Sequence, residues 1–313
     1  MRQYSLIAPA KINLYLEIIG DRPDGFHELA MVLQSIDLAD KIDIKAIGIE
    51  TINIRCDHPE VPADNANLAY RAAALLSKQF PDVFARYGGV EITIHKRIPV
   101  AAGLAGGSTN AAAVLVGLDM LWQLGLTRSE LEELGAQLGS DIPFCIAGGT
   151  SLATGRGEKL SPLPDLENLY VVLAKYRSLS VSTAWAYKTY RQQFGDSYVT
   201  DLDNLESRRQ RVHSGPMVSA IAHRDGAKIG NLLYNDLEKV VLPEYPQVLK
   251  LREAFAAENV LGTMMSGSGP TVFALTESRQ HAEEVRSEVS AKIGVVGLDF
   301  WIAKFNPTGI TLA

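Results

Sequence analysis

Hydrophobic and polar positions alternate in ways that predict both strands and helices along this chain. Residues 90–95 alternate Val and Ile with Glu, Thr and His, the period-two pattern of a half-buried strand. Residues 111–121 are rich in Ala, Leu, Val and Met without Pro, which is typical of a buried helix. The first half also has expected strands at 5–7, 12–19 and 42–54, and a strand and turn at 147–157. Helices are expected at 68–80 and 128–138, and Thr127 is the expected cap of the helix at 128–138. The second half has expected strands at 169–174, 271–275 and 300–305, and helices at 182–194, 230–240, 246–258 and 279–292.

These elements predict an α+β protein with two domains. The chain has 313 residues, which fits two ordinary domains better than one. Pro162 and Pro164 interrupt the pattern and mark the expected boundary, so the domains are 1–163 and 164–313. The second domain is expected to pack helices on an antiparallel sheet, with the active site in the cleft between the domains.

The loop between the strand at 90–95 and the helix at 111–121 is expected to hold phosphate. Residues 99–110 read PVAAGLAGGSTN, with Ser108, Thr109 or Asn110 as the expected helix cap. The first amides of a helix lack partners and the helix dipole is positive there, so an anion is stabilised. The three glycines let the backbone approach that anion closely. An ordinary tight turn entering a buried helix is the alternative interpretation.

Spacing excludes two better-known phosphate loops. A P-loop needs Lys and Ser or Thr after its last Gly, but Ser108 directly follows Gly107 and no Lys lies between Val100 and Asn110. The dinucleotide fingerprint needs Gly where Ala105 stands, counted from Gly103. The loop therefore belongs to another class.

Charge and cysteine content narrow the function classes. The net charge of −6 argues against a general binder of nucleic acid or membrane surfaces. The one dense basic cluster, Arg208, Arg209 and Arg211, has no interleaved aromatic residue and is typical of a solvated helix or linker. Two cysteines and six scattered histidines argue against a disulfide scaffold and a dedicated zinc site. With no long apolar run, the expected location is the cytoplasm.

Polar residues among apolar neighbours are the candidate catalytic groups. Lys11 and Asn13 share one face of an extended segment and can point into a cleft together, although a lysine on such a face is also commonly solvent-exposed. Asp141 enters the apolar segment 142–144, where a carboxylate needs a partner, and Lys11 is a natural candidate. A turn or capping role for Asp141 remains the alternative.

Two turns are weaker candidates. Phe26 and His27 follow an Asp-Gly pair, which by itself indicates the end of a hairpin. Residues 265–270 form a glycine-serine turn whose backbone amides can bind an anion, or which is an ordinary turn before a strand.

Taken together, three segments resemble the three motifs of the GHMP kinases in the same order. They are Pro-Ala-Lys-Ile-Asn-Leu at 9–14, Pro-x3-Gly-Leu-Ala-Gly-Gly-Ser-Thr-Asn at 99–110, and Ser-Gly-Ser-Gly-Pro-Thr at 266–271. The resemblance spans nearly the whole chain and implies a two-domain, ATP-dependent kinase that uses Mg²⁺. Residues 22–29 and 139–144 look most like the members that act on a cytidine diphosphate sugar alcohol in isoprenoid biosynthesis.

The resemblance also implies roles for individual residues. Asp141 matches the catalytic base, and Lys11 matches the lysine that orients the acceptor hydroxyl and stabilises the developing alkoxide. Ser108 is expected near Mg²⁺. The residues expected around ATP are Asn67, Lys96, Pro99, Val100, Ala101, Ala102, Gly103, Leu104, Ala105, Gly106, Gly107, Ser108 and Thr109. The residues expected around the acceptor are Asn13, Phe26, His27 and Tyr187, with Phe26 and Tyr187 on either side of the cytosine and His27 bonded to its edge.

The chain departs from the usual family pattern at three positions. Ala102 and Ala105 stand where the family more often has Gly, and Phe26 stands where Tyr is common. The methyl group of Ala105 is expected to require a negative φ.

The acceptor pocket distinguishes three alternatives. Phe26 and His27, with Lys11 and Asp141, favour the cytidine diphosphate acceptor. Another GHMP kinase, for mevalonate or a sugar, would share the ATP loop and need a different pocket. A non-catalytic GHMP-like regulator is disfavoured by the retention of Lys11 and Asp141. The expected partners are these small molecules alone, without nucleic acid or membrane, in a monomer or weak homodimer.

Overall fold

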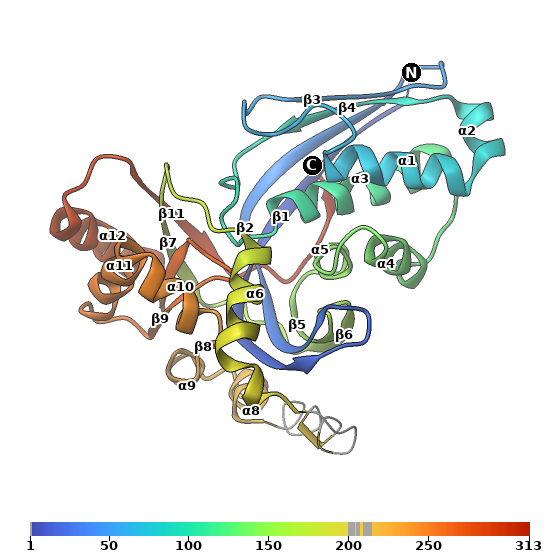
Figure 1. The fold of residues 1–313 in the computed structure, drawn as a ribbon. Helices are drawn as coiled ribbons and strands as arrows, with labels where there is room; N and C mark the ends of the chain where they lie inside the picture. The colour runs from blue at the N-terminus through green and yellow to red at the C-terminus, as the bar shows by residue number, and fades with distance from the viewer. Residues whose placement is uncertain (1, 200–203, 205–206, 209–214) are drawn as a thin grey trace.

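Two β-sheets with helices packed against them form the protein, as Figure 1 shows. The computed structural model describes residues 2–199, 204, 207–208 and 215–313. The elements of the first half are β1 (Gln3–Asp21), β2 (His27–Ala46), β3 (Ile52–Cys56), α1 (Leu68–Gln79), α2 (Pro81–Tyr87), β4 (Val90–His95), α3 (Gly106–Trp122), α4 (Arg128–Ala136), α5 (Ile142–Ala147), β5 (Thr150–Gly155) and β6 (Lys159–Leu163). Those of the second half are β7 (Tyr170–Tyr176), α6 (Thr183–Phe194), the 3₁₀ turn η1 (Gly195–Ser197), α8 (Pro216–Ala222), α9 (Gly226–Asn231), β8 (Tyr234–Asn235), α10 (Glu238–Glu244), α11 (Pro246–Ala256), β9 (Gly262–Met265), β10 (Val272–Thr276), α12 (Arg279–Ile293), β11 (Leu298–Lys304) and β12 (Thr311–Leu312).

The long antiparallel pair β1 and β2 is the centre of the first sheet. The pair runs from Gln3 opposite Lys45 to Asp21 opposite His27, with a register shift between Asn13 and Tyr15. Strands β4 and β5 pair with β2, while β3 and β6 extend these edges. Such a shift bends a strand and turns its side chains, and this one lies beside the candidate residues of β1.

Helix α3 is apolar almost all round because it is covered on several sides. It packs on β1 and β2 and is flanked by α1 and α5. At Gly117 the sheet approaches closely, since a Cβ there would lie 2.5 Å from Cδ1 of Ile44. A helix that is buried on several sides needs no amphipathic stripe. Its close packing against the sheet holds the helix, and with it the helix start, in a fixed position.

The second sheet has the order β11-β7-β10-β9 and is antiparallel throughout, as expected. Both of its faces are covered, which explains the nearly continuous apolar sequence of β7. Val171 and Leu173 pack with Ile12 of β1 in one cluster. Val172 and Ala174 pack in another, together with residues of α11 and α12. The α+β class with two sheets is thus confirmed.

The predicted boundary at 163/164 stays a prediction. The chain leaves the first sheet after β6, yet two short later strands return to it: β8 pairs with β1 in parallel and β12 pairs with β1 antiparallel.

Three predictions about elements were wrong in detail. Strands expected at 5–7 and 12–19 are one strand, β1, because residues 8–11 between them, which include the buried Lys11, are also paired with β2. The strand expected at 42–54 is the end of β2 and then β3. The helix expected at 230–240 is divided into the end of α9, β8 and the start of α10. The cap of α4 by Thr127 is confirmed and forms a capping box with Glu130.

Two further features that the sequence raises are membrane-spanning helices and the basic cluster of Arg208, Arg209 and Arg211. Within the described ranges no helix is both long and apolar enough to cross a membrane. In the basic cluster, Arg209 and Arg211 lie outside the described residues, and Arg208 forms an ion pair with Glu17.

Candidate active site

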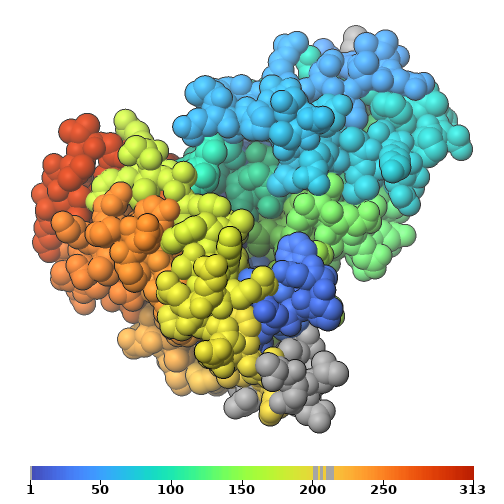
Figure 2. Space-filling model, viewed as in Figure 1, coloured from blue at the N-terminus to red at the C-terminus, as the bar shows by residue number. Residues whose placement is uncertain are grey.

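A cavity of about 960 Å³ gathers most of the candidate residues. It is lined by the loop at 99–108, by Lys11 and Asn13 of β1, by α6 and by residues 267–269 of the glycine-serine turn. Figure 2 shows its opening as a hollow between the N-terminal half and the yellow helix α6. The candidate residues thus share one cavity, and its place in a cleft between two domains stays a prediction.

The loop at 99–105 leads into a helix that no side chain caps. Helix α3 begins at Gly106, and its cap residue is Ala105, which makes no side-chain bond to the helix. The prediction that Ser108, Thr109 or Asn110 caps the helix is therefore wrong, because these residues already lie inside the helix. The amides of residues 106–108 are left for a ligand, since the first bond within the helix is from the Thr109 N–H to the Ala105 carbonyl.

The backbone of this loop is strained at two alanines. Ala105 has a φ of 57° and Ala101 a φ of 49°, so Ala105 lacks the negative φ that its methyl group was expected to require. The left-handed conformation costs an alanine about 1–2 kcal/mol. Gly103 is also left-handed, with a φ of 73°, and its Cβ position lies only 2.3 Å from the Ser266 carbonyl oxygen. The loop is thus pressed against the glycine-serine turn.

Thr109 is the exception among the loop residues. Its side chain is fully buried and is not part of the cavity lining, and its N–H is bonded to Ala105. The expected contact between Thr109 and ATP stays a prediction, and Thr109 is the one expected residue from 99 to 109 that does not line the cavity. The other residues expected from Pro99 to Ser108 all line the cavity.

Lys11 and Asp141 meet in the cavity, as their chemistry predicts. Nζ of Lys11 lies 3.6 Å from Oδ2 of Asp141 and donates to Oδ1 of Asn13 at 2.8 Å. Lys11 is buried, while the Asp141 side chain is 32% exposed. Asp141 stands at the cap of α5 but makes no capping bond, so its carboxylate is free of that alternative role. A carboxylate with an adjacent ammonium can accept a proton from an alcohol.

An aromatic pocket forms the end of the cavity near the hairpin of β1 and β2. The rings of His27 and Tyr187 have centroids 5.1 Å apart, and Phe26 is 51% exposed. The guanidinium of Arg156 lies 4.8 Å from the centre of the Phe26 ring. Nε2 of His27 is buried and has no hydrogen-bond partner among the described residues. Oδ1 of Asp21 lies 3.8 Å from this nitrogen, so the pocket offers mainly its flat ring faces to a ring-shaped ligand.

Burial lowers the pKa of His27 below its ordinary value of 6.5, and the charge of Arg191 adds to this effect against the opposing charge of Asp21. The folded protein therefore binds this proton less readily than the unfolded chain. We expect the stability contributed by neutral His27 to be present at neutral pH and to be lost as pH falls below about 6.5. Melting temperatures of wild type and His27→Gln between about pH 7.5 and pH 5 test this, and the wild type should lose more stability over that range. His223→Gln at an exposed position is the control, and equal pH profiles for wild type and His27→Gln would contradict the expectation.

Asn67 and Lys96 line the other end of the cavity, but their polar atoms already have partners. Asn67 caps α1 at the Ala69 N–H and donates to the Pro62 carbonyl. Lys96 forms an ion pair with the buried Asp40, and its Nζ lies near the Cβ position of Gly106. Both residues therefore shape the cavity wall beside the start of α3.

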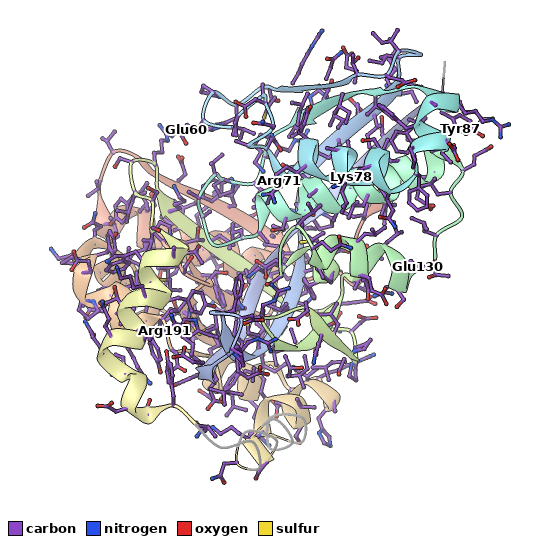
Figure 3. All side chains as sticks on the ribbon, turned by 45° about the vertical axis from the view of Figure 1, so that its right-hand side comes forward. Glu60, Arg71, Lys78, Tyr87, Glu130 and Arg191 are labelled. Atoms are coloured by element: carbon purple, nitrogen blue, oxygen red, sulfur yellow. The ribbon has the colours of Figure 1, made fainter. Side chains whose placement is uncertain are left out.

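Three cationic side chains of the cavity were missed by sequence reasoning. They are Arg156, Lys188 and Arg191. Arg191 bonds Asp21 and the Gly25 carbonyl, which ties α6 to the hairpin. It lies four residues after Tyr187, so helical spacing on α6 was a usable signal for it. Figure 3 shows Arg191 on α6 well apart from Glu60, which lines the opposite part of the cavity.

Known families match both halves of the chain. Residues 67–149 match the GHMP kinases N terminal domain, and residues 217–294 match GHMP kinases C terminal. The first region contains the strained loop, α3 and Asp141, and the second contains the glycine-serine turn.

Curated relatives match over the full length. The chain is 72% identical to the 4-diphosphocytidyl-2-C-methyl-D-erythritol kinase of Trichodesmium erythraeum, with 100% of both chains covered. It is 68% identical to the enzyme of the same name from Nostoc punctiforme, with 99% of this chain and 98% of the relative covered. These relatives show that the likeness is not limited to one domain.

Solved structures show the same fold. A crystal structure of 4-(cytidine 5'-diphospho)-2C-methyl-D-erythritol kinase is 30% identical and covers 96% of this chain and 99% of its own, with a TM-score of 0.73. The homoserine kinase of Cytophaga hutchinsonii has a TM-score of 0.74 at 18% identity, covering 100% and 98% of the two chains. The second likeness concerns the fold alone.

Proposed function

The chain belongs to the GHMP kinase family and is an ATP-dependent kinase; we propose that it phosphorylates the 2-hydroxyl of 4-diphosphocytidyl-2-C-methyl-D-erythritol for isoprenoid precursor synthesis. One observation carries the proposal: the pair of Lys11 and Asp141 lies in one cavity with the uncapped start of α3 and with an aromatic pocket. A kinase for this acceptor needs these three parts together.

ATP is proposed to bind with its phosphates at the loop 99–108. The unpaired amides at the start of α3 and the positive helix dipole favour the phosphate charge. Asn67 and Lys96 shape the wall where the rest of the nucleotide would lie, and Lys96 supplies a nearby positive charge.

Phosphoryl transfer is proposed to use Asp141 as the base. Asp141 takes the proton of the 2-hydroxyl as that oxygen forms a bond to the γ-phosphorus, while the bond from this phosphorus to ADP breaks. The Lys11 ammonium, held by Asn13, orients the hydroxyl and stabilises the negative charge that develops on its oxygen. The helix dipole at Gly106 stabilises the transferred group.

The cytosine ring is proposed to lie between Phe26 and Tyr187. Every base presents a flat face, and stacking on an aromatic ring contributes about 1–3 kcal/mol per base. His27 is neutral at pH 7 because burial lowers its pKa, so its ring offers one donor and one acceptor to the cytosine edge.

Mg²⁺ is proposed to bind through the Ser108 hydroxyl and the phosphates of ATP. The described residues hold no cluster of three or more His, Cys, Asp or Glu side chains arranged for a metal. This fits Mg²⁺, which is commonly held by one or two protein oxygens together with substrate phosphates and water. When bound, the ion would neutralise phosphate charge. A cytoplasmic location and a monomeric or weakly dimeric state also remain predictions.

A panel of acceptor alcohols tests the proposed function. We expect ADP release in the presence of ATP and Mg²⁺ to be at least about 100-fold more efficient with the cytidine diphosphate acceptor than with mevalonate, galactose or homoserine, because only that acceptor fills the aromatic pocket. The comparison is made in kcat/KM. Equal turnover of mevalonate or a sugar would favour another GHMP kinase activity, and no turnover of any acceptor would favour the non-catalytic alternative.

A further inference from the structure

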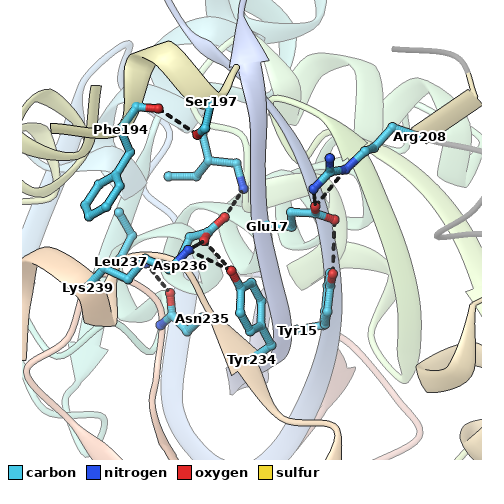
Figure 4. A network of polar contacts seen from close by, with 11 residues as sticks. Tyr15, Glu17, Phe194, Ser197, Arg208, Tyr234, Asn235, Asp236, Leu237 and Lys239 are labelled. Carbon is cyan, nitrogen blue, oxygen red and sulfur yellow. Dashed lines mark hydrogen bonds and ion pairs between the residues drawn. The ribbon is translucent and has the colours of Figure 1, made fainter. Parts of the chain in front are cut away.

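The short strand β8 and the residues after it are fastened to β1, the strand that carries Lys11 and Asn13. Strand β8 pairs in parallel with β1, Leu16 lying opposite Asn235. The Asp236 N–H donates to the Leu16 carbonyl at 2.9 Å, and Oδ2 of Asp236 accepts from the Ile18 N–H at 2.8 Å. Figure 4 shows Asp236 at the centre of this network, with Tyr234 and Lys239 on its other oxygen. The segment therefore has a fixed position relative to the catalytic strand.

Asn235 reaches in the opposite direction, to the glycine-serine turn. Its Nδ2 donates to the carbonyls of Met265 and Gly267, both at 2.8 Å, and its Oδ1 accepts from the Leu237 N–H at 2.9 Å. The side chain is buried and does not line the cavity. Glu238 adds a bond from the Met265 N–H. Both amide hydrogens of Asn235 thus hold the turn from behind.

The turn that Asn235 holds lies against both the phosphate loop and Asn13. Gly267, Ser268 and Gly269 line the cavity. Oγ of Ser266 donates to the Gly103 carbonyl at 3.1 Å. A Cβ on Gly267 would lie 3.2 Å from the Gly103 oxygen and 3.4 Å from Oδ1 of Asn13. The turn thus contacts the phosphate loop and lies beside the partner of Lys11.

We propose that Asn235 is a positioning residue for phosphoryl transfer: it fixes the glycine-serine turn at the distance from β1 that aligns the phosphate loop with Lys11 and Asp141. The proposal rests on the proposed kinase function of this cavity. The turn has its own internal bonds, from the Gly269 N–H to the Ser266 carbonyl and from the Ser266 N–H to the Thr271 carbonyl. Without Asn235 the turn is displaced as a unit, and small displacements of reacting groups are costly for rate.

The test is Asn235→Asp, which keeps the shape of the side chain and the acceptor for the Leu237 N–H. It replaces both donors by an oxygen that faces two carbonyls. We expect kcat to fall about 10-fold or more, while KM for the cytidine diphosphate acceptor stays within about 2-fold because the Phe26, His27 and Tyr187 pocket is untouched. Relative to wild type, activity should recover from about pH 8 to about pH 6, because protonation of the new carboxyl restores one donor.

Val289→Ala is the control for a general loss of stability. Val289 is fully buried in α12, away from the cavity. This variant should lower the melting temperature and leave kcat and both KM values unchanged. A folded Asn235→Asp enzyme with wild-type kcat would overturn the proposal, as would a change in stability alone that matches Val289→Ala.

ATP binding separates this proposal from the proposed function. The rise in melting temperature on adding ATP and Mg²⁺ should be smaller in Asn235→Asp than in wild type, because the displaced turn moves the phosphate loop. If the wild type does not phosphorylate the cytidine diphosphate acceptor, the proposed function fails. The ATP-induced rise in melting temperature then becomes the only test of the positioning role of Asn235. A shift equal to that of wild type would then overturn the positioning role.

Discussion

Asp141→Asn is expected to lower kcat by about 10²-fold or more, because an amide cannot accept the proton of the attacking hydroxyl. The substitution preserves the shape of the side chain and leaves an oxygen that can face Lys11 at a similar distance. Asp141 makes no capping bond to α5, so loss of its charge does not remove a helix cap. The defect should therefore appear in turnover and not in folding.

Steady-state kinetics with the cytidine diphosphate acceptor measure this effect, and the ATP-induced melting shift checks that nucleotide binding is retained. Asp225→Asn is the matched control, because Asp225 also stands at a helix cap but bonds the Lys228 N–H outside the cavity. It should keep wild-type kcat. Turnover of Asp141→Asn within about 10-fold of wild type would remove Asp141 as the base.

The parts of the site that follow from local chemistry were predictable from the sequence. Lys11 and Asn13 share a face because side chains alternate along a strand, and their hydrogen bond confirms this. The pairing of Lys11 with Asp141 joins residues far apart in the chain. It was predictable because a carboxylate entering an apolar segment needs a partner and the family motifs supply the lysine.

The parts that depend on tertiary packing were not predictable. The length of β1 is hidden because its buried polar residues interrupt the apolar pattern that sequence reading follows. The strand β8 is two residues long and exists only because β1 offers it a partner, so the sequence suggested a helix through it. Positive φ at Ala105 is likewise imposed by the contacts of the loop and not by its sequence.

The contacts of the cations in the aromatic pocket likewise depend on tertiary packing. Arg156 reaches Phe26 from the end of β5, and Arg191 reaches Asp21 from α6. These contacts cross between elements that are distant in sequence. Arg156 has no local signal that distinguishes it from a surface residue, whereas the helical spacing of Arg191 from Tyr187 was a usable one. The aromatic pocket therefore depends more on the fold than the loop at 99–108 does.

Gly103→Ala is expected to lower kcat/KM by about 10²-fold or more, because it forces apart the phosphate loop and the glycine-serine turn, the two backbone segments proposed to enclose the phosphates. The new methyl group would lie 2.3 Å from the Ser266 carbonyl oxygen and 3.1 Å from the backbone of Gly269. These are backbone atoms, so no side chain can rotate away and the whole loop or turn must shift.

Gly125→Ala is the matched control: Gly125 has a φ of 70°, close to the 73° of Gly103, but no atom lies within 4 Å of its Cβ position. Both variants carry the left-handed cost of about 1–2 kcal/mol, so similar losses of melting temperature are expected from that source, with an added loss for Gly103→Ala from the collision. Only Gly103→Ala should lose ATP affinity and turnover. Wild-type kinetics for Gly103→Ala would mean that the contact between the phosphate loop and the glycine-serine turn does not set the geometry of transfer.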